Sequence, residues 1–392
     1  GHEYAFVRDR IRAQGAETLL IDTGTLGEPL VEADVTREEV AQAAGTSIAR
    51  LAQDHDRDAA IAAMGAGARA LVAGLVDERR LHGVLALGGS SGSTLAATVM
   101  QALPIGFPKM IVSTVASGDT RAYVGNVDIV MMSSIVDIAG LNRLSEQILS
   151  NAAGAIVGMA TAHATFAPSA TTRPLIGATM FGVTTPAITT ARERLEALGY
   201  EVLVFHATGV GGDTMESLIA SGVITGVLDL TTTEFADAHV GATLPAGPDR
   251  LLSAGRAGYP MVVSIGALDM ANWGPMNTVP ARFRDRTLFR HNASVTLMRT
   301  TPEENAAIGR EIAQRLNQAT GPVTLMIPLG GVSAIDVPGA AFHDPAADAA
   351  LIAALKETLS PRITVIEREE EINDPAFATA AADELHRLYA HP

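Results

Sequence analysis

The feature that most constrains this chain is an alternation of short apolar runs with longer helix-like segments, which continues from one end to the other. Such an order is typical of a mostly parallel sheet with helices on both faces. The sequence therefore predicts an α/β protein. The expected strands are 18–21, 83–87, 109–114, 128–133, 175–181, 201–206, 226–230, 261–265, 323–328 and 362–367, with a β-rich passage at 294–299.

The segments between these strands are expected to be helices because their apolar residues recur at helical spacing. The clearest start signal is at 301–304, where proline and two acidic residues follow a threonine. The segment 141–162 is apolar nearly all round, so we expect it to be buried between elements or at a subunit interface. The expected helices are 4–13, 36–52, 59–80, 95–103, 141–162, 187–198, 214–220, 302–318, 346–359 and 375–389.

At 392 residues the chain is long enough for two domains. The segment 165–174 carries two prolines and shows no periodicity, which is typical of a linker. Both halves repeat the same strand–loop–helix unit. We therefore expect domains at 1–168 and 169–392, each with its own parallel sheet, and a ligand crevice between them.

The beginning of the chain is unusual for this fold class. Residues 4–13 are expected to be a helix, so the first domain would begin without its first strand. Gly1 and His2 could remain from a cleaved tag, or a strand could precede residue 1. We favour the missing strand.

Composition excludes several classes of protein. The chain has no cysteine, which removes disulfides and thiolate metal sites and is compatible with a cytoplasmic protein. A net charge of −15 argues against nucleic acid as the main partner. No apolar run reaches the roughly 18 residues that a membrane span needs, and no secretory signal is visible. We expect a cytoplasmic protein that binds neither a membrane nor nucleic acid.

A Gly/Ser-rich segment between the expected strand 83–87 and the expected helix 95–103 points to a ligand class. Glycines let a backbone approach a ligand closely, and the following helix would aim free N–H groups at it. This combination suits an anion, most simply a phosphate, although a plain strand-to-helix turn would explain it too. The segment is neither a Walker loop nor a complete dinucleotide fingerprint. The candidate ligand residues here are Gly88, Gly89, Ser90, Ser91, Gly92, Ser93 and Thr94.

Three other loops after expected strands are also rich in glycine and hydroxyl residues, and a fourth follows strand 323–328 as Pro-Leu-Gly-Gly-Val-Ser. Ligands of parallel sheets bind outside the carboxyl ends of the strands, where such loops lie. Capping and turn formation explain each loop by itself. Together they would line the interdomain crevice with N–H and hydroxyl donors. Their candidate residues are Ser117, Gly118, Thr184, Thr185, Thr208, Gly209, Gly211 and Gly212.

Five ionisable residues are candidates for chemistry. Asp213 could serve a ligand or simply complement a helix dipole. Glu234 could bind a metal or act as a base, or it could be a surface residue. Asp269 lies near the only tryptophan in a turn that could be structural, and Arg290 with His291 could meet an anion or form a solvated turn. No motif of a zinc or serine hydrolase is present.

Several long passages resemble one family. They include 3–9, 18–24, 88–94, 264–270 and 295–304, and they follow the same order over nearly the whole chain. By these motifs the chain resembles the bacterial relatives of the ATP-binding N-terminal domain of the tomato mosaic virus resistance protein, a long-uncharacterised protein family. The resemblance implies two Rossmann-like subdomains, binding of ATP or a related nucleotide with Mg²⁺, and a homodimer. The family also has a strand and an Asp-Thr-Lys-Gly-like loop before the match to Glu3.

These observations lead to one main expectation and two alternatives. We expect a nucleotide-binding protein, with Mg²⁺-dependent phosphoryl transfer or ATP hydrolysis as its possible chemistry. In that case a metal would supply much of the positive charge, because few cations converge on the loops. The first alternative is an isomerase or lyase acting on a phosphorylated or carboxylate metabolite. The second is a non-enzymatic module that binds a protein partner under control of a nucleotide.

Overall fold

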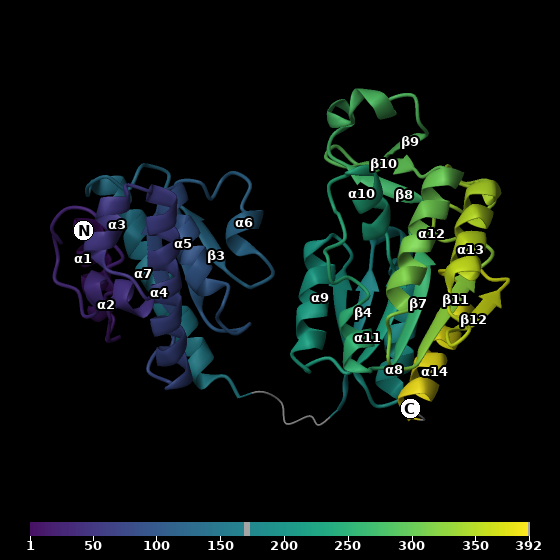
Figure 1. Ribbon diagram of the computed structural model, residues 1–392, viewed down its shortest axis with the longest axis horizontal. Coiled ribbons are helices and arrows are strands. Elements are labelled where there is room, and N and C mark those ends of the chain that lie inside the picture. Colours follow the sequence, from purple (N-terminus) through teal and green to yellow (C-terminus); the bar gives the residue numbers. More distant parts are fainter. Residues whose placement is uncertain (168–172, 391–392) are drawn as a thin grey trace. The chain divides into compact units, whose positions relative to one another are not determined.

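The computed structural model describes residues 1–167 and 173–390. The chain divides into two compact units, Gly1–Ser169 (unit 1) and Ala170–Pro392 (unit 2), which are described separately (Figure 1). The expected boundary at 168/169, and half of the expected linker 165–174, lie outside the described residues. Both units are α/β structures with parallel sheets flanked by helices. The predicted fold class of two Rossmann-like subdomains is confirmed.

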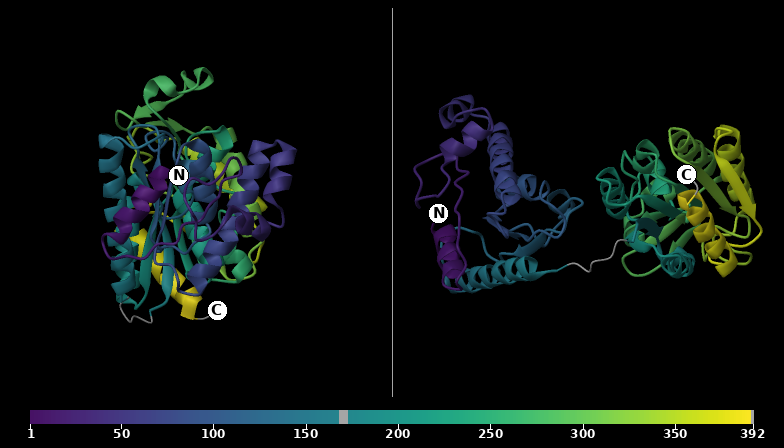
Figure 2. Two further views of the ribbon diagram at one scale, coloured as in Figure 1. Left: turned by 90° about the vertical axis from the view of Figure 1, so that its left-hand side faces the viewer. Right: turned by 90° about the horizontal axis from the view of Figure 1, so that it is seen from below.

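Unit 1 contains a three-stranded parallel sheet with the order β1-β2-β3. Its strands are β1 (Val84–Gly88), β2 (Lys109–Ser113) and β3 (Val130–Ser133). Side chains alternate between the faces of β2, so that Met110 and Val112 pack with α1 (His2–Arg12) and α7 (Arg143–Thr165). Ile111 packs on the other face with α5 (Ser90–Met100). Figure 2 shows α1 beside α7, on the opposite side of the sheet from α4 (Arg57–Asp77).

Two sequence-based expectations for unit 1 are wrong. The expected helix 36–52 is two helices, α2 (Arg37–Ala43) and α3 (Ile48–Asp54), because Gly45 takes a left-handed conformation with φ +72° that ends the first one. The expected strand 18–21 does not form, and only an isolated bridge joins Ile21 to Val35. The short helix α6 (Arg121–Val124) completes the unit.

Two long helices of unit 1 are strongly apolar. Only one face of α7 is buried, through residues such as Leu149, Ala152 and Ile156, so it is not enclosed all round within unit 1. Contrary to the expectation from the sequence, helix α4 is long and apolar enough to cross a membrane, the one such helix among the described residues. Buried helices of globular cores pass the same test. Ala60, Met64 and Val72 of α4 are buried inside unit 1.

Two glycines of α4 allow a matched test of this packing. A Cβ at Gly67 would collide with the carbonyl oxygen of Val40 in α2, whereas a Cβ at Gly74 would meet nothing within 4 Å. We expect Gly67→Ala to destabilise unit 1 by about 1–3 kcal/mol through overpacking. Gly74→Ala should stabilise it by about 0.5–1 kcal/mol, because alanine is the better helix former. Urea unfolding of both variants, followed by circular dichroism, checks the sign, and two changes of the same sign would contradict the packing.

Unit 2 is built on a six-stranded parallel sheet with the order β12-β11-β7-β6-β4-β5. The chain passes from β4 to the edge strand β5 and then crosses back to β6, on the other side of β4. This reversal makes a topological switch point between β4 and β6, where open α/β sheets bind their ligands. The strands are β4 (Leu175–Met180), β5 (Glu201–His206), β6 (Gly226–Thr231), β7 (Met261–Gly266), β11 (Val323–Pro328) and β12 (Thr364–Arg368).

Helices cover both faces of the unit 2 sheet. One apolar cluster joins the sheet to α8 (Thr185–Ala197) and α14 (Pro375–Ala390), and a second joins its other face to four further helices. Those helices are α9 (Val210–Ala220), α11 (Ser253–Ala257), α12 (Pro302–Leu316) and α13 (Pro345–Thr358).

A small antiparallel sheet adjoins the carboxyl ends of the large one (Figure 1). Its order is β8-β10-β9, and the amide of Thr300, just after β10, donates to the carbonyl oxygen of Asp269, just before β8. The turns η1 to η3 and helix α10 lie among the loops of the unit. The bounds are β8 (Met270–Trp273), β9 (Leu288–Arg290), β10 (Thr296–Arg299), α10 (Glu234–Val240), η1 (Gly182–Thr184), η2 (Met276–Thr278) and η3 (Ala281–Phe283).

Candidate functional site

The Gly/Ser-rich segment of unit 1 lies at the carboxyl end of β1, as expected, but most of it is helical. Helix α5 begins at Ser90, five residues before its expected start at 95. Serine and glycine are weak helix formers, so a prediction from helix propensity places the start of this helix too late in the sequence. Packing overrides the propensity: a Cβ at Gly88 would lie 2.8 Å from the Cα of Gly92, so the strand end and the first turn of the helix touch. Ser90 to Thr94 are therefore the opening turns of α5.

The first turn of α5 is open. Gly89 is its N-cap and makes no side-chain capping bond. Among the described residues, no hydrogen-bond acceptor engages the N–H groups of Ser90, Ser91 or Gly92. The first N–H groups of a helix need an outside acceptor and carry the positive end of its dipole. This turn thus presents free hydrogen-bond donors to an anion.

One cation faces the same turn. Arg57 begins α4, and its Nη2 donates to Oγ of Ser91 at 3.3 Å. The neighbouring Asp56 is occupied as the N-cap of α4, accepting from the N–H of Ala59 at 2.9 Å. Arg57 itself is exposed, so its guanidinium is free to turn toward a bound anion. Arg57 is not among the residues predicted from the sequence, because nothing in the sequence indicates that the starts of α4 and α5 lie together.

Buried hydroxyl groups hold the turn in place. Ser93 and Ser113 share a hydrogen bond of 2.7 Å between their Oγ atoms, and both side chains are buried. The N–H of Thr114 donates to the carbonyl oxygen of Gly88 at 3.2 Å, which ties the loop after β2 to the end of β1. Ser93 thus fixes the helix start, whereas Ser90 and Thr94 are exposed.

The loop after β2, which Thr114 ties to the end of β1, carries exposed groups. Ser117 and Gly118 are both exposed, and the N–H of Gly118 donates to the carbonyl oxygen of Val115. A little further on, the guanidinium of Arg121 bonds Asp119 and lowers the pKa of that carboxyl to about 2. Asp119 therefore stays ionised and keeps this arginine neutralised. Arg57 is left as the cation in contact with the first turn.

The glycine loop of unit 2 has a different environment. Gly209 adopts φ +79° and is the N-cap of α9, and its N–H donates to Oε1 of Glu234 at 2.7 Å. A Cβ at Gly211 would collide with the carbonyl oxygen of His206. A Cβ at Gly212 would lie 2.6 Å from Oε1 of Glu234. These glycines serve close packing, and a carboxylate already occupies the start of α9.

That carboxylate belongs to a buried ionic cluster around Arg250. The guanidinium donates to Glu234 Oε2 at 2.5 Å and to Asp229 Oδ1 at 2.8 Å, and Glu216 lies 3.7 Å away. All four side chains are buried. Burial raises the pKa of Glu216 and of Glu234, and the charge of Arg250 opposes that rise. Burial alone would lower the pKa of Arg250, but its carboxylate neighbours raise it well above the usual value.

Asp213, in the first turn of α9, lies near this cluster, and Glu234, the first residue of α10, is part of it. Asp213 is half-buried, and burial raises its pKa while the charge of Arg250 lowers it. Glu234 is fully buried and bonded on both oxygens. Its geometry is that of a structural anchor between α9, α10 and the loop that carries Arg250. Arg250 is not among the predicted site residues, because no local pattern marks it.

The threonines at the switch point divide into internal and exposed groups. Thr184 is buried, and its Oγ1 lies 2.8 Å from Oγ1 of Thr231, which joins the loop after β4 to the end of β6. Thr185 is exposed and donates to the carbonyl oxygen of Phe181. Thr208 is half-buried and donates to the carbonyl oxygen of its near neighbour in β5. Of the three, Thr185 presents its side chain to solvent.

Asp269 belongs to a second buried acidic cluster. Ser333 donates to its Oδ2 at 2.8 Å, while its Oδ1 has no partner among the described residues. Burial raises the pKa of Asp269 to about 7, and the charge of Arg299 opposes the rise. Burial, together with the charges of Asp269 and Asp348, raises the pKa of Asp336 to about 8. At neutral pH this cluster therefore holds protons.

The remaining candidates lie on the small sheet. Arg290 ends β9 and His291 follows it, and both are exposed. The N–H of His291 donates to the carbonyl oxygen of Val295, as in a hairpin turn. Neither is in contact with the buried clusters of Arg250 or Asp269. Within 1–167 and 173–390, no group of three or more His, Cys, Asp and Glu side chains is arranged to hold a metal ion.

Comparison with known proteins gives the relationship of the chain. The N-terminal domain of a family described as "Uncharacterised protein family (UPF0261)" matches residues 1–165, and its C-terminal domain matches residues 173–389. A UPF0261 protein of Clostridium tetani is 50% identical over 386 residues, which cover 98% of this chain and 95% of that protein. A UPF0261 protein of Rhizobium meliloti is 48% identical over 395 residues, covering 100% of this chain and 97% of that protein.

The chain is also similar to a plant protein. The ToMV resistance protein Tm-1(GCR237) of Solanum lycopersicum is 44% identical over 332 residues, which cover 83% of this chain and 44% of that protein. The resemblance noted in the sequence thus extends to this relative. Since both domain matches and the bacterial relatives span nearly its whole length, this chain belongs to the UPF0261 family.

Proposed function

We propose that this protein binds a nucleotide of the ATP type and holds its phosphates at the N-terminus of α5 in unit 1. The observation that carries the proposal is the open first turn of α5 with Arg57 beside it. Three N–H groups that need acceptors, Ser90 to Gly92, and one guanidinium then face the same anion. The resemblance to a family with ATP-binding members supports the choice of a nucleotide over other phosphates.

The surroundings of the turn suit a phosphate in particular. Gly89 carries no side chain, and a Cβ built there would approach only Oγ1 of Thr114, at 3.5 Å. A phosphate oxygen could therefore approach the backbone closely. Hydrogen bonds from backbone N–H groups and from a charged donor are stronger toward an anion than toward a neutral acceptor. The exposed hydroxyl of Ser90 adds a donor in the first turn of the helix.

Magnesium fits this proposal as a partner of the nucleotide. The chain carries a net charge of −15, which repels a free nucleotide. A Mg²⁺ ion on the phosphates lowers the charge of the ligand and prefers phosphate and water oxygens to a dedicated protein cage. We therefore propose that Mg²⁺ enters bound to the nucleotide. Phosphoryl transfer or hydrolysis would then depend mainly on positioning and on this charge neutralisation. A homodimer, which the resemblance implies, and a cytoplasmic location, with which the absence of cysteine is compatible, are further parts of the proposal.

Calorimetry with MgATP tests the site. We expect Arg57→Gln to weaken binding about 10-fold, since a hydrogen bond to a charged group contributes about 1.5 kcal/mol or more. Gly89→Asp should abolish binding, because a carboxylate would compete for the same N–H groups. Arg69→Gln, at an exposed position on the same helix as Arg57, is the matched control and should leave the affinity unchanged. Equal affinities in all four proteins would remove this turn from the site.

The same geometry also suits a single phosphate group. One cation and one helix start are enough to hold a phosphate monoester, so an isomerase or lyase acting on a phosphorylated metabolite is the second candidate. A thermal-shift screen separates the two candidates: stabilisation by sugar phosphates but not by MgATP favours the second. MgATP binding without turnover, together with MgATP-dependent capture of a protein partner, would instead indicate a nucleotide-controlled binding module.

A further inference from the structure

Unit 2 carries a basic lobe on an otherwise acidic chain. The basic lobe is the stretch 274–295 between β8 and β10, and Figure 1 shows it projecting beyond the large sheet at the top of the view. Within it, residues 281–290 contain four arginines and one aspartate, a net charge of +3 in a chain of net charge −15. A patch of one sign on a body of the other attracts a partner of opposite charge.

Two of the four arginines hold the basic lobe together. Arg286 donates to both carboxylate oxygens of Glu304, at 3.0 and 2.8 Å, which ties the lobe to α12. The guanidinium of Arg282 lies 4.6 Å from the centre of the Phe283 ring. That ring packs against Trp273 of β8, with 5.5 Å between the ring centroids. The lobe is therefore an ordered scaffold, and a partner would not have to order it on binding.

The other two arginines are free. Arg284 and Arg290 are exposed, and among the described residues neither has an ion pair or a side-chain hydrogen bond. Both lie within four residues of β9, Arg284 before the strand and Arg290 at its end. A guanidinium group binds a carboxylate through two parallel N–H donors. This part of the lobe therefore suits a partner that carries carboxylates.

The backbone of β9 adds a free strand edge at the same place. β9 is the outer strand in the order β8-β10-β9. The N–H of His291 donates to the carbonyl oxygen of Val295, so the odd-numbered residues of 287–291 turn their peptide groups toward β10. The N–H and C=O groups of Leu288 and Arg290 face the other way. Within the part of the chain that the structure describes, nothing pairs with them.

We propose that the free edge of β9 receives an extended acidic segment of a partner protein, which becomes the fourth strand of the small sheet. A strand edge with unpaired peptide groups is a template for another chain. Main-chain bonds to Leu288 and Arg290 would hold the added strand, while its carboxylates would pair with the guanidinium groups of Arg284 and Arg290. Because β9 has three residues, the affinity would depend on the backbone and on the charges together.

Charge and backbone together select this partner over two other macromolecules. Two β9 edges from two copies of the chain would bring the same arginines face to face, which disfavours a second copy at this edge. A nucleic acid has the right charge, but it cannot form the ladder of N–H and C=O bonds that a strand edge offers. It would also extend over the acidic remainder of the surface.

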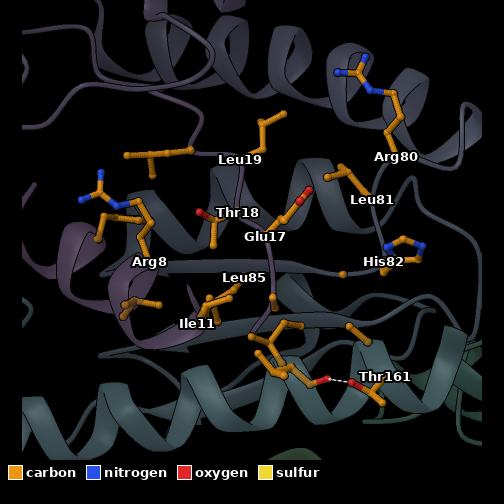
Figure 3. A pocket seen from close by; sticks show the side chains of 18 of the residues that line it. Arg8, Ile11, Glu17, Thr18, Leu19, Arg80, Leu81, His82, Leu85 and Thr161 are labelled. Carbon is orange, nitrogen blue, oxygen red and sulfur yellow. Dashed lines mark hydrogen bonds between the residues drawn. The ribbon is translucent and has the colours of Figure 1, made fainter. Parts of the chain in front are cut away.

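The shape of the basic lobe argues against a small molecule as the partner. Small ligands bind in concave pockets. The roomy cavity of this chain is a groove of about 480 Å³ along the free edge of β1 in unit 1, where Figure 3 shows Ile11, Thr18 and Leu85 around it. A much smaller cavity lies between the loop after β3 and α7. The basic lobe lines neither of these two cavities. The inference is independent of the proposed nucleotide site.

Fluorescence anisotropy of labelled peptides, titrated with the full chain, tests the proposal. The probe is Glu-Val-Glu-Val-Glu-Val-Glu. The matched peptide Gln-Val-Gln-Val-Gln-Val-Gln removes the charges, and Glu-Val-Glu-Pro-Glu-Val-Glu keeps them but removes a central backbone donor. We expect each matched peptide to bind at least 10-fold more weakly than the probe. A probe that fails to bind at about 1 mM would refute the proposal, and so would equal binding of the proline peptide, because charge alone would then explain it.

Protein variants and hydrogen exchange locate the peptide. Arg284→Gln combined with Arg290→Gln should weaken the probe about 10-fold, whereas Arg310→Gln, exposed and unpaired on α12, should leave its affinity unchanged. In the parent chain, saturating probe should slow exchange of the Arg290 amide at least 10-fold and leave the Phe289 amide, which already faces β10, unchanged. An unaffected Arg290 amide contradicts the added strand. Tighter binding of a single-stranded oligonucleotide than of the probe, or a dimer that the double variant disrupts, would assign the lobe to another partner and overturn the proposal.

Discussion

Replacing Arg250 with methionine is expected to destabilise unit 2 by about 3–5 kcal/mol, the usual effect of removing one partner from a buried ion pair. The guanidinium is fully buried and is the cation that faces Asp229, Glu234 and Glu216. Methionine fills a similar volume but leaves three buried carboxyl groups without a positive neighbour. They would have to take up protons or repel one another. The loss should therefore be greatest at high pH.

The measurement is urea unfolding followed by the fluorescence of Trp273, the single tryptophan of the chain, which is buried in unit 2. Arg256→Met is the matched control, because Arg256 pairs with Asp249 at 2.6 Å but both side chains are more than half exposed. Exposed pairs contribute about 0–1 kcal/mol, so the control should unfold nearly as the parent does. Equal losses in the two variants would mean that the buried cluster does not hold unit 2 together.

A comparison of the two units shows which strands of this α/β fold can be predicted from the sequence. In unit 2 every strand of the large sheet is flanked on both faces by helices, and the apolar runs at 201–206 and 323–328 match β5 and β11 residue for residue. In unit 1 the apolar run 18–21 is equally clear, yet it remains outside the sheet. A strand needs a neighbour as well as an apolar pattern, and here the position next to it is a groove.

The candidate site shows the same limit of prediction from sequence: local turns can be predicted, but contacts between distant residues cannot. The Gly/Ser segment predicts a turn at the end of β1, because its glycines and small side chains have a direct local meaning. Arg57 comes to that turn from a helix 34 positions earlier in the chain, and no local pattern announces this contact. Arg250 joins the glycine loop to Asp229 in the same nonlocal way. Loops can be predicted from their own residues, whereas the charges that face them depend on tertiary packing.

The second prediction with a large expected effect is a pH dependence of the free energy of unfolding, which Asp269 causes. Burial raises the pKa of this carboxyl to about 7 in the folded protein, whereas an unfolded chain has a value of about 3.9. Between these two values the folded state keeps a proton that the unfolded state has lost. Stability must therefore fall as the pH rises through this window, by about 1.4 kcal/mol per pH unit for one such group. Above the folded value the loss is complete and levels off.

Asp269→Asn separates this contribution from that of the other acids. The amide mimics the protonated carboxyl and can still accept the hydrogen bond from Ser333. Between pH 5 and pH 7 we expect the variant to lose about 2 kcal/mol less stability than the parent does, as measured by urea unfolding with Trp273 fluorescence. Removing the charge of Asp269 also lowers the pKa of Asp336, which flattens the curve further. Asp249→Asn, at an exposed position, should keep the slope of the parent. Parallel curves for all three proteins would show that Asp269 is ionised throughout this range, and that its burial is compensated by a partner other than a proton.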